Sequence, residues 1–160
     1  MIRNIETRDL QRVCDIYNHY VQTTYISFEE APVSAEEMGR RMLEYTSEYP
    51  WLVFEEDGEV LGFAYASKWR PRPAYRFTLE VTIYLDKEHL GRGIGTQLYS
   101  ILFTQLKNLD IHSVIATIAL PNEKSQALHE SLGFKQVAHF KEMGFKFNQR
   151  IDVGYWQKML

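Results

Sequence analysis

The sequence predicts a mixed α/β sandwich that forms a single domain over residues 1–160. The chain is 45% hydrophobic and 14% aromatic, which is enough for one well-buried core and short for two. Two helical patterns come first, and two apolar runs joined at Asp57-Gly58 follow as a strong hairpin signal. The remaining pattern is strand, helix, strand, helix, strand. This order indicates a sheet covered by helices.

Two amphipathic patterns near the start predict helices. In residues 7–21, Thr7 or Asp9 can cap the first helix, and apolar side chains recur three and four apart at Leu10, Val13, Cys14, Tyr17, Tyr20 and Val21. In residues 34–45, Ser34 and Glu37 form a predicted capping box. Its buried stripe is expected to be Met38, Met42 and Tyr45.

Strand patterns dominate the middle of the chain. Residues 51–69 read as the hairpin, and the loop "KWRPRPAYR" after it contains two prolines that exclude a central strand or a helix. In residues 78–86 the side chains alternate strictly. One face is expected in the core (Leu79, Val81, Ile83, Leu85), and the other is expected to face chemistry or water (Glu80, Thr82, Tyr84).

The second half predicts two further helices between strands. A helical stripe is expected at Leu98, Ile101, Leu102, Leu106 and Leu109. Residues 112–120 read as a buried strand, typical of a parallel or central position. Residues 125–134 read as a short helix that stops at Gly133. Strands joined at Gly144 and around Asn148 are expected to complete the chain.

Composition excludes several classes of function. The formal net charge of -3 gives no global electrostatic reason to expect nucleic acid or an anionic membrane as partner. No apolar run approaches the roughly 20 residues of a membrane helix, and no secretion signal is recognisable. The single cysteine, Cys14, cannot form an internal disulfide, so we expect a cytoplasmic protein. The five histidines show no i, i+4 pairing, so no metal site is expected.

Three glycines at alternate positions separate the strand at 78–86 from the following helix. Gly91, Gly93 and Gly95 place successive N–H groups before a helix N-terminus, which is typical of a phosphate site. A P-loop is excluded because Thr96-Gln97 follows the last glycine. A dinucleotide fingerprint fails because Thr96 stands where its third glycine belongs. A turn that caps the helix and binds nothing remains an alternative.

Two motifs resemble the signatures of the GNAT N-acetyltransferases. "HLGRGIGTQL" resembles their acetyl-CoA pyrophosphate loop, Gln/Arg-x-x-Gly-x-Gly/Ala, with Leu90 in place of Gln or Arg. "LPNEKSQALHESLGF" resembles their second signature, an Asn followed by a helix that ends in Gly-Phe. Over residues 2–158, stretches such as "DGEVLGFAYASKW" and "GFKFNQRIDVGYWQ" resemble the phosphinothricin acetyltransferase branch, which includes methionine sulfone and methionine sulfoximine acetyltransferases.

The resemblance implies a fold and a donor. The fold is a central mixed, mostly antiparallel twisted sheet flanked by helices, and the acetyl donor is acetyl-CoA. Residues matching the family's coenzyme site are Gly91, Arg92, Gly93, Ile94, Gly95, Thr96, Asn122 and Ser125. Asn122 is expected to bond the pantetheine arm. Backbone N–H groups at Ile83, Tyr84 and Leu85 are expected to face the thioester oxygen.

The same resemblance implies the catalytic groups. An amine acceptor must lose a proton before it attacks, and Glu80 stands where this branch has its proposed general base. His129 lies four residues before Gly133, where many relatives have a tyrosine, and could protonate the leaving thiolate. A solvated glutamate and a packed histidine are the alternatives. Without a G-x-S-x-G motif, direct attack on the thioester is favoured over an acyl-enzyme.

A basic loop is the candidate acceptor site. Lys68, Arg70, Arg72 and Arg76 fall within nine residues and could clamp a carboxylate and a phosphinate or sulfone oxygen. The resemblance implies that Arg70, Arg72 and Tyr75 bind the acceptor, with Phe28 as an apolar wall. An ordinary solvated loop and an ordinary core phenylalanine are the alternatives.

The expected function is acetyl transfer from acetyl-CoA to the α-amino group of a small amino acid or analogue, in detoxification or ordinary metabolism. A homodimer is expected from the family. Acetylation of a protein or peptide N-terminus is an alternative, which requires an open groove. A non-catalytic acetyl-CoA sensor is another.

Overall fold

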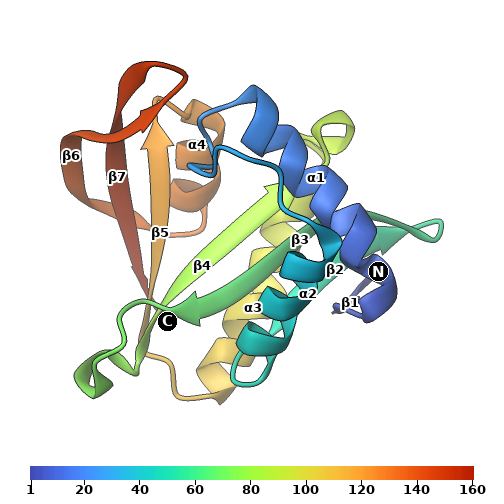
Figure 1. Cartoon of the computed structure of the whole chain (residues 1–160). Coiled ribbons are helices and arrows are strands. Elements are labelled where there is room, and N and C mark those ends of the chain that lie inside the picture. Colours follow the sequence, from blue (N-terminus) through green and yellow to red (C-terminus); the bar gives the residue numbers. More distant parts are fainter.

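A seven-stranded sheet in the order β1-β2-β3-β4-β5-β7-β6 forms the centre of the molecule (Figure 1). The computed structural model describes residues 1–160. The strands are β1 (Ile2–Asn4), β2 (Trp51–Glu56), β3 (Glu59–Lys68), β4 (Thr78–Leu85), β5 (Ser113–Leu120), β6 (Lys135–Lys146) and β7 (Gln149–Met159). Only β4 and β5 pair in parallel, and every other pairing is antiparallel. The predicted mixed, mostly antiparallel sheet is confirmed.

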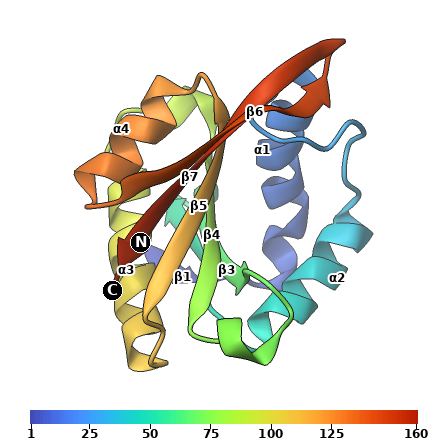
Figure 2. The same ribbon diagram turned by 90° about the vertical axis from the view of Figure 1, so that its left-hand side faces the viewer.

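Four α-helices cover the two faces of the sheet (Figure 2). They are α1 (Leu10–Thr23), α2 (Ala35–Thr46), α3 (Ile94–Asn108) and α4 (Glu123–Ser131). α1 and α2 lie on one face over a cluster that includes Trp51 and Phe63. α3 and α4 lie on the other face, where the larger cluster includes Leu79, Val81 and Trp156. The alternation predicted for 78–86 therefore sends its two sets of side chains to two different layers.

The hairpin turn and the Ser34 cap of the first half are confirmed, but the Glu37 carboxylate pairs with Arg40 and Arg41 and does not complete the predicted capping box. Asp57 and Gly58 both have positive φ, 50° and 81°, and they join β2 to β3 as the hairpin signal predicts. Ser34 caps α2 by accepting a hydrogen bond from the Glu37 N–H at 3.1 Å. The first helix is different, because a 3-10 turn at Thr7–Asp9 precedes it. Asp9 accepts from the Glu6 N–H at 2.8 Å and so fixes that turn instead of capping α1.

The buried stripe of α3 differs from the predicted one. Ile101 and Leu109 are exposed, whereas Tyr99 and Phe103 are buried beside Leu98, Leu102 and Leu106. The buried residues therefore alternate in steps of one and three, which is the period of a helix face packed on a sheet. Tyr99 can be buried in this face because its hydroxyl forms a hydrogen bond with His129 on α4.

Gly144 does not join two strands. β6 runs through it to Lys146, and the turn to β7 consists of Phe147 and Asn148, which have φ of 51° and 58°. Gly144 is needed for close packing, since a Cβ there would lie 2.4 Å from the Phe28 ring. The register of β6 with β7 shifts between Phe140 and Gly144, so the strand bends before it reaches the turn.

No helix is of the length and apolar character that crossing a bilayer requires. His, Cys, Asp and Glu side chains form no group of three or more that could hold a metal ion.

Candidate active site

β4 and β5 separate part-way along their length, and this separation creates the site. Three residue pairs join them, from Thr78 opposite Ser113 to Glu80 opposite Ile115. Both strands continue beyond these pairs without facing partners on that side. β4 keeps one register with β3 throughout. The gap therefore arises from splaying of two neighbouring strands, with no bulge in β4.

Backbone N–H groups of β4 face this gap at alternate residues. In an antiparallel ladder, hydrogen-bonded and non-bonded pairs alternate. The Asp86 N–H donates to the Leu61 carbonyl at 2.8 Å, which fixes the phase of the ladder. Tyr84 therefore bonds across to β3, whereas Ile83 and Leu85 direct their N–H groups into the gap. Of the three donors expected from the sequence, these two have the required direction.

The glycine loop leads directly into the N-terminus of α3. Gly91 and Gly93 have φ of 76° and 75°, and a Cβ at either residue would meet no atom within 4 Å. The first helical bond is from the Gln97 N–H to the Gly93 carbonyl, so the N–H groups of residues 94–96 have no helical partner. The two glycines therefore leave open, positively polarised space with no Cβ in it, as a diphosphate site requires.

A cavity of about 590 Å³ runs from this loop between the end of β4 and α4. Lys124 is the only lysine or arginine among the lining residues of this cavity. The N-terminus of α3 is a second source of positive potential. Tyr20 closes one side, where its hydroxyl donates to the Leu85 carbonyl at 2.6 Å. The volume and the polarised end fit a coenzyme with a diphosphate and a long arm.

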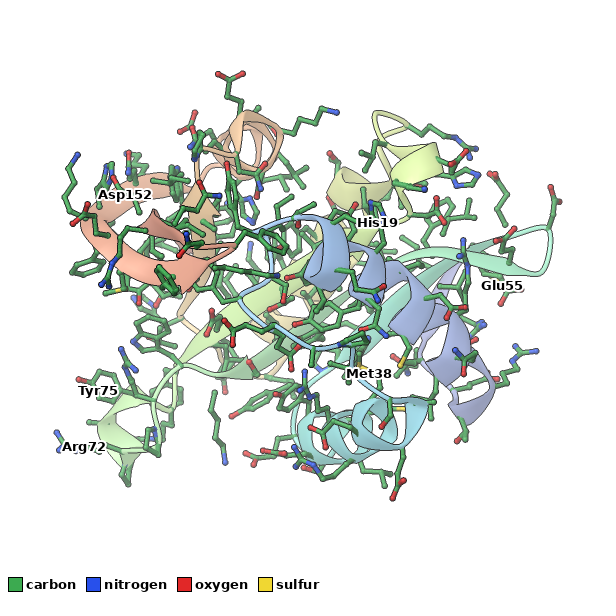
Figure 3. All side chains as sticks on the ribbon, turned by 45° about the horizontal axis from the view of Figure 1, so that its top comes forward. His19, Met38, Glu55, Arg72, Tyr75 and Asp152 are labelled. Atoms are coloured by element: carbon green, nitrogen blue, oxygen red, sulfur yellow. The ribbon has the colours of Figure 1, made fainter.

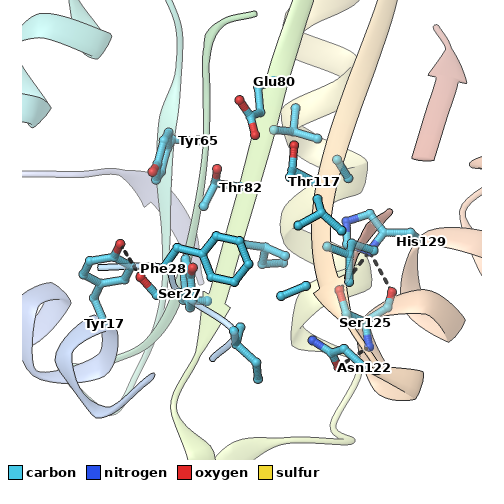
Figure 4. A pocket seen from close by; sticks show the side chains of 18 of the residues that line it. Tyr17, Ser27, Phe28, Tyr65, Glu80, Thr82, Thr117, Asn122, Ser125 and His129 are labelled. Atoms are coloured by element: carbon cyan, nitrogen blue, oxygen red, sulfur yellow. Dashed lines mark hydrogen bonds between the residues drawn. The ribbon is translucent and has the colours of Figure 1, made fainter. Parts of the chain in front are cut away.

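A second cavity of about 480 Å³ continues from the first into the gap between β4 and β5 (Figure 4). The two cavities share five lining residues: Ile26, Ile83, Tyr84, Asn122 and Ser125. Glu80, Thr82 and Thr117 project from the two splayed strands, and Phe28 reaches in from the loop after α1. A thioester at the end of the first cavity would therefore enter the second, within the space that holds the Glu80 carboxylate.

The wall opposite α4 comes from α1 and the loop that follows it. The hydroxyls of Tyr17 and Ser27 are 2.8 Å apart, and burial raises the pKa of Tyr17 to about 12. Glu29 forms an ion pair with Arg41 at 2.5 Å. Burial alone would raise the pKa of Glu29, but the hydrogen bonds from Arg41 outweigh it and hold that pKa below its usual range. Both Tyr17 as a phenol and Glu29 as a carboxylate are thus fixed in one protonation state.

His129 is buried between α4 and α3. Its Nδ1 lies 2.7 Å from the Ser125 carbonyl, which can only accept, so Nδ1 carries the proton. Its Nε2 lies 3.2 Å from the Tyr99 hydroxyl and accepts from it. Burial lowers the pKa of His129, which the bond to Ser125 only partly offsets. A neutral ring with its N–H already engaged has no free proton, so donation to a thiolate requires His129 to become charged against its burial.

The second cavity, which we name the acceptor cavity after the role expected from the sequence, contains two carboxylates, Glu29 and Glu80, and no lysine or arginine among its lining residues. Arg70, Arg72 and Tyr75 are all exposed, and none lines the cavity of its own chain. Figure 3 shows Arg72 and Tyr75 at the end of a loop that projects from the molecule. One chain therefore brings Glu80, Phe28 and His129 together, but not the basic loop.

Two other predicted residues have local partners. Asn122 caps α4 by accepting a hydrogen bond from the Ser125 N–H at 3.2 Å, which leaves its side-chain NH₂ directed to the shared part of the cavities without a partner in the chain. Arg92 forms an ion pair with Glu56 at 2.8 Å and does not line the first cavity, which we name the coenzyme cavity after its expected occupant.

Sequence reasoning missed much of the acceptor wall. Tyr65 and Thr117 come from strands whose polar alternate residues could have indicated it, whereas Thr82 lies on the face that the alternation of residues 78–86 had already indicated. Tyr99 stood inside an apolar helical pattern, and a buried hydroxyl there signals a polar partner. Lys124, Tyr17 and Glu29 carry no local signal of their position.

The protonation of His129 makes stability depend on pH. Its pKa in the folded chain lies below the ordinary value of about 6.5, so below that pH the unfolded chain binds a proton that the folded chain excludes. The free energy of unfolding should therefore fall from about pH 7.5 to about pH 5.5, and fall less in His129→Gln. Urea titrations at both pH values measure this. Equal slopes for the wild type and His129→Gln contradict the assignment.

Comparison with known proteins agrees with this geometry. Residues 2–154 match the family model described as an acetyltransferase (GNAT) domain. The chain is 38% identical over 157 residues to a phosphinothricin N-acetyltransferase of Streptomyces viridochromogenes, covering 98% of this chain and 86% of that protein. It is 32% identical to an L-methionine sulfoximine/L-methionine sulfone acetyltransferase of Salmonella typhimurium, covering 99% and 94%.

A solved structure extends the comparison to the coenzyme. A phosphinothricin acetyltransferase from Sinorhizobium meliloti, solved in complex with AcCoA, superposes with a TM-score of 0.96 at 38% identity and covers 100% of this chain and 88% of that one. The splayed strands, the open glycine loop and the two joined cavities are thus found in a chain that belongs to the GNAT family of acetyl-CoA-dependent N-acetyltransferases.

Proposed function

We propose that this enzyme transfers acetyl from acetyl-CoA to the α-amino group of a small amino acid or analogue of the phosphinothricin or methionine sulfone type. One observation carries the proposal: the Glu80 carboxylate lines a cavity that shares five lining residues with the coenzyme cavity. The names of the relatives, which act on such analogues, support the acceptor class.

The proposed chemistry is direct attack. Acetyl-CoA supplies an acetyl group activated as a thioester. The acceptor nitrogen forms a bond to the carbonyl carbon, the carbon–sulfur bond breaks, and Glu80 accepts the proton that the amine loses. The Ile83 and Leu85 N–H groups, which face the gap, stabilise the negative charge that develops on the carbonyl oxygen. Asn122 bonds the pantetheine arm through its free NH₂.

The sulfur leaves as a thiolate near His129. We propose His129 as the proton donor to the thiolate when its ring is charged in the complex with acetyl-CoA and the acceptor. If His129 stays neutral, its role is to join α4 to α3 through Ser125 and Tyr99, and solvent then protonates the thiolate.

We further propose a cytoplasmic homodimer in which each subunit completes the acceptor site of the other. An amino acid acceptor carries a carboxylate, yet the cavity of one chain offers it no cation. The unused cations lie on the projecting loop that holds Arg70 and Arg72. Exposed apolar side chains on β6 provide a surface for a second copy: Val137, Phe140, Met143 and Phe145.

Two other functions predict different products. A protein or peptide N-terminal acetyltransferase would modify a peptide amine and leave free amino acids unchanged. A non-catalytic sensor would bind acetyl-CoA and release no thiol with any acceptor. A thiol-release screen against phosphinothricin, methionine sulfone, methionine sulfoximine and a short peptide separates all three.

Glu80→Gln should lower turnover by about 10²- to 10⁴-fold, because the amine loses its proton acceptor. Acetyl-CoA affinity, measured by calorimetry, should stay unchanged, since Glu80 does not line the coenzyme cavity. Glu36→Gln, at an exposed glutamate in the first turn of α2, is the matched control. Full turnover by Glu80→Gln would remove Glu80 from the mechanism.

Mixing two inactive variants should restore activity if the basic loop acts across the dimer. Glu80→Gln keeps an intact loop, and Arg70→Ala/Arg72→Ala keeps an intact cavity. Random heterodimers contain one complete site, so mixed subunits should recover about a quarter of wild-type activity. If the loop serves its own chain, mixing recovers nothing.

Gly93→Ala should weaken acetyl-CoA binding by about tenfold, because the positive φ is strained for alanine and the methyl group fills space that the diphosphate needs. Gly58→Ala carries the same kind of strain, at φ of 81°, in a hairpin remote from the cavities. Both variants should lose stability in thermal unfolding, but only Gly93→Ala should lose affinity in calorimetry. Equal affinities would place the diphosphate elsewhere.

A further inference from the structure

Lys146 is a buried lysine that the proposed chemistry does not use. It is the last residue of β6, and only 2% of its surface is exposed. A buried ammonium group is costly unless its hydrogens find acceptors. Desolvation lowers the pKa of Lys146, and the nearby carboxylates Glu30 and Glu29 partly offset this. Its retention inside the fold therefore depends on specific partners.

Those partners are two backbone carbonyls from another part of the chain. The Lys146 ammonium donates to the Val21 carbonyl and to the Ser27 carbonyl, each at 2.7 Å. Val21 lies in the last turn of α1, where carbonyls lack helical partners and favour a positive charge. Ser27 lies in the loop that follows. One side chain thus joins the β6–β7 turn to the end of α1 and to this loop, and Figure 2 shows the turn reaching over the top of α1.

The same loop forms the wall of the acceptor cavity. Ser27, Phe28 and Glu29 all line it. The Ser27 hydroxyl contacts the Tyr17 hydroxyl and accepts from the Glu29 N–H at 3.2 Å. The Ser27 backbone carbonyl has only Lys146 as its side-chain donor. Lys146 therefore fixes the main chain immediately before Phe28.

Gly144 contacts Phe28, the residue after Ser27, from the same face of β6 as Lys146. Residues two apart in a strand project to one side, so Gly144 and Lys146 both face the loop. A Cβ at Gly144 would lie 2.4 Å and 2.5 Å from two atoms of the Phe28 ring. The ring thus packs directly on the backbone of β6. Phe28 remains 43% exposed, so these contacts determine its position more than burial does.

We propose that Lys146 and Gly144 are positioning residues that hold Phe28 over the acceptor cavity and thereby determine affinity for the acceptor, independently of acetyl-CoA. The inference rests on the proposed acceptor site. Phe28 lines the acceptor cavity and not the coenzyme cavity, so the two affinities should respond differently.

Lys146→Met removes the donors and keeps a long, unbranched side chain. It should raise the acceptor KM by about tenfold or more, while the acetyl-CoA Kd changes less than about twofold. Lys135→Met, at an exposed lysine of the same strand, should match wild type in both. Hydrogen exchange of amides 24–33 should accelerate in Lys146→Met alone. Unchanged exchange and unchanged acceptor KM, or an equal loss of both affinities, overturns the proposal.

A second pair of variants keeps the test decisive if Lys146→Met fails to fold. Gly144→Ala should raise the acceptor KM in the wild-type background and have little added effect in Phe28→Ala, because the clash needs the ring. Additive effects in the two backgrounds overturn the role of Gly144. The hydrogen-exchange measurement needs no turnover. If the wild-type protein acetylates no amino acid, the proposed function is refuted, but exchange in the loop still tests whether Lys146 fixes it.

Discussion

The whole site depends on the limited pairing of β4 with β5. Three residue pairs hold the strands together at one end, and beyond Glu80 they diverge. Splaying leaves backbone N–H groups of β4 unpaired, which is unfavourable unless water or a ligand bonds them. It also opens the interior of the sheet to a substrate. The same departure from regular structure thus supplies both the space and the hydrogen-bond donors, on a strand whose other edge is rigidly paired with β3.

The two helical layers fix different sides of this gap. α3 and α4 fix the coenzyme side through a helix N-terminus and through the buried contacts of His129 with Ser125 and Tyr99. α1 and its following loop fix the acceptor side through hydroxyl contacts and the ammonium of Lys146.

The sequence predicted features that depend on local chemistry. Positive φ at Asp57-Gly58, the cap at Ser34 and the glycine loop follow from conformational preferences of those residues alone. The sheet composition and the cofactor also followed, because two spaced motifs resembled a family. Features that depend on tertiary contacts did not follow. Gly144 reads as a turn residue until the Phe28 ring is seen against it, and the burial of Tyr99 requires its partner on α4.

The basic loop could be recognised from the sequence but not placed, because a charge cluster carries no information about which chain it faces. The open space at Gly91 and Gly93 has a different meaning from the tight space at Gly144. At Gly144 neighbouring atoms exclude a side chain, whereas at the other two only backbone handedness does. A mirror-image alanine would adopt that handedness without strain and would still occupy the room above the amides. At this loop, the fold and the proposed diphosphate binding therefore constrain the same atoms for separable reasons.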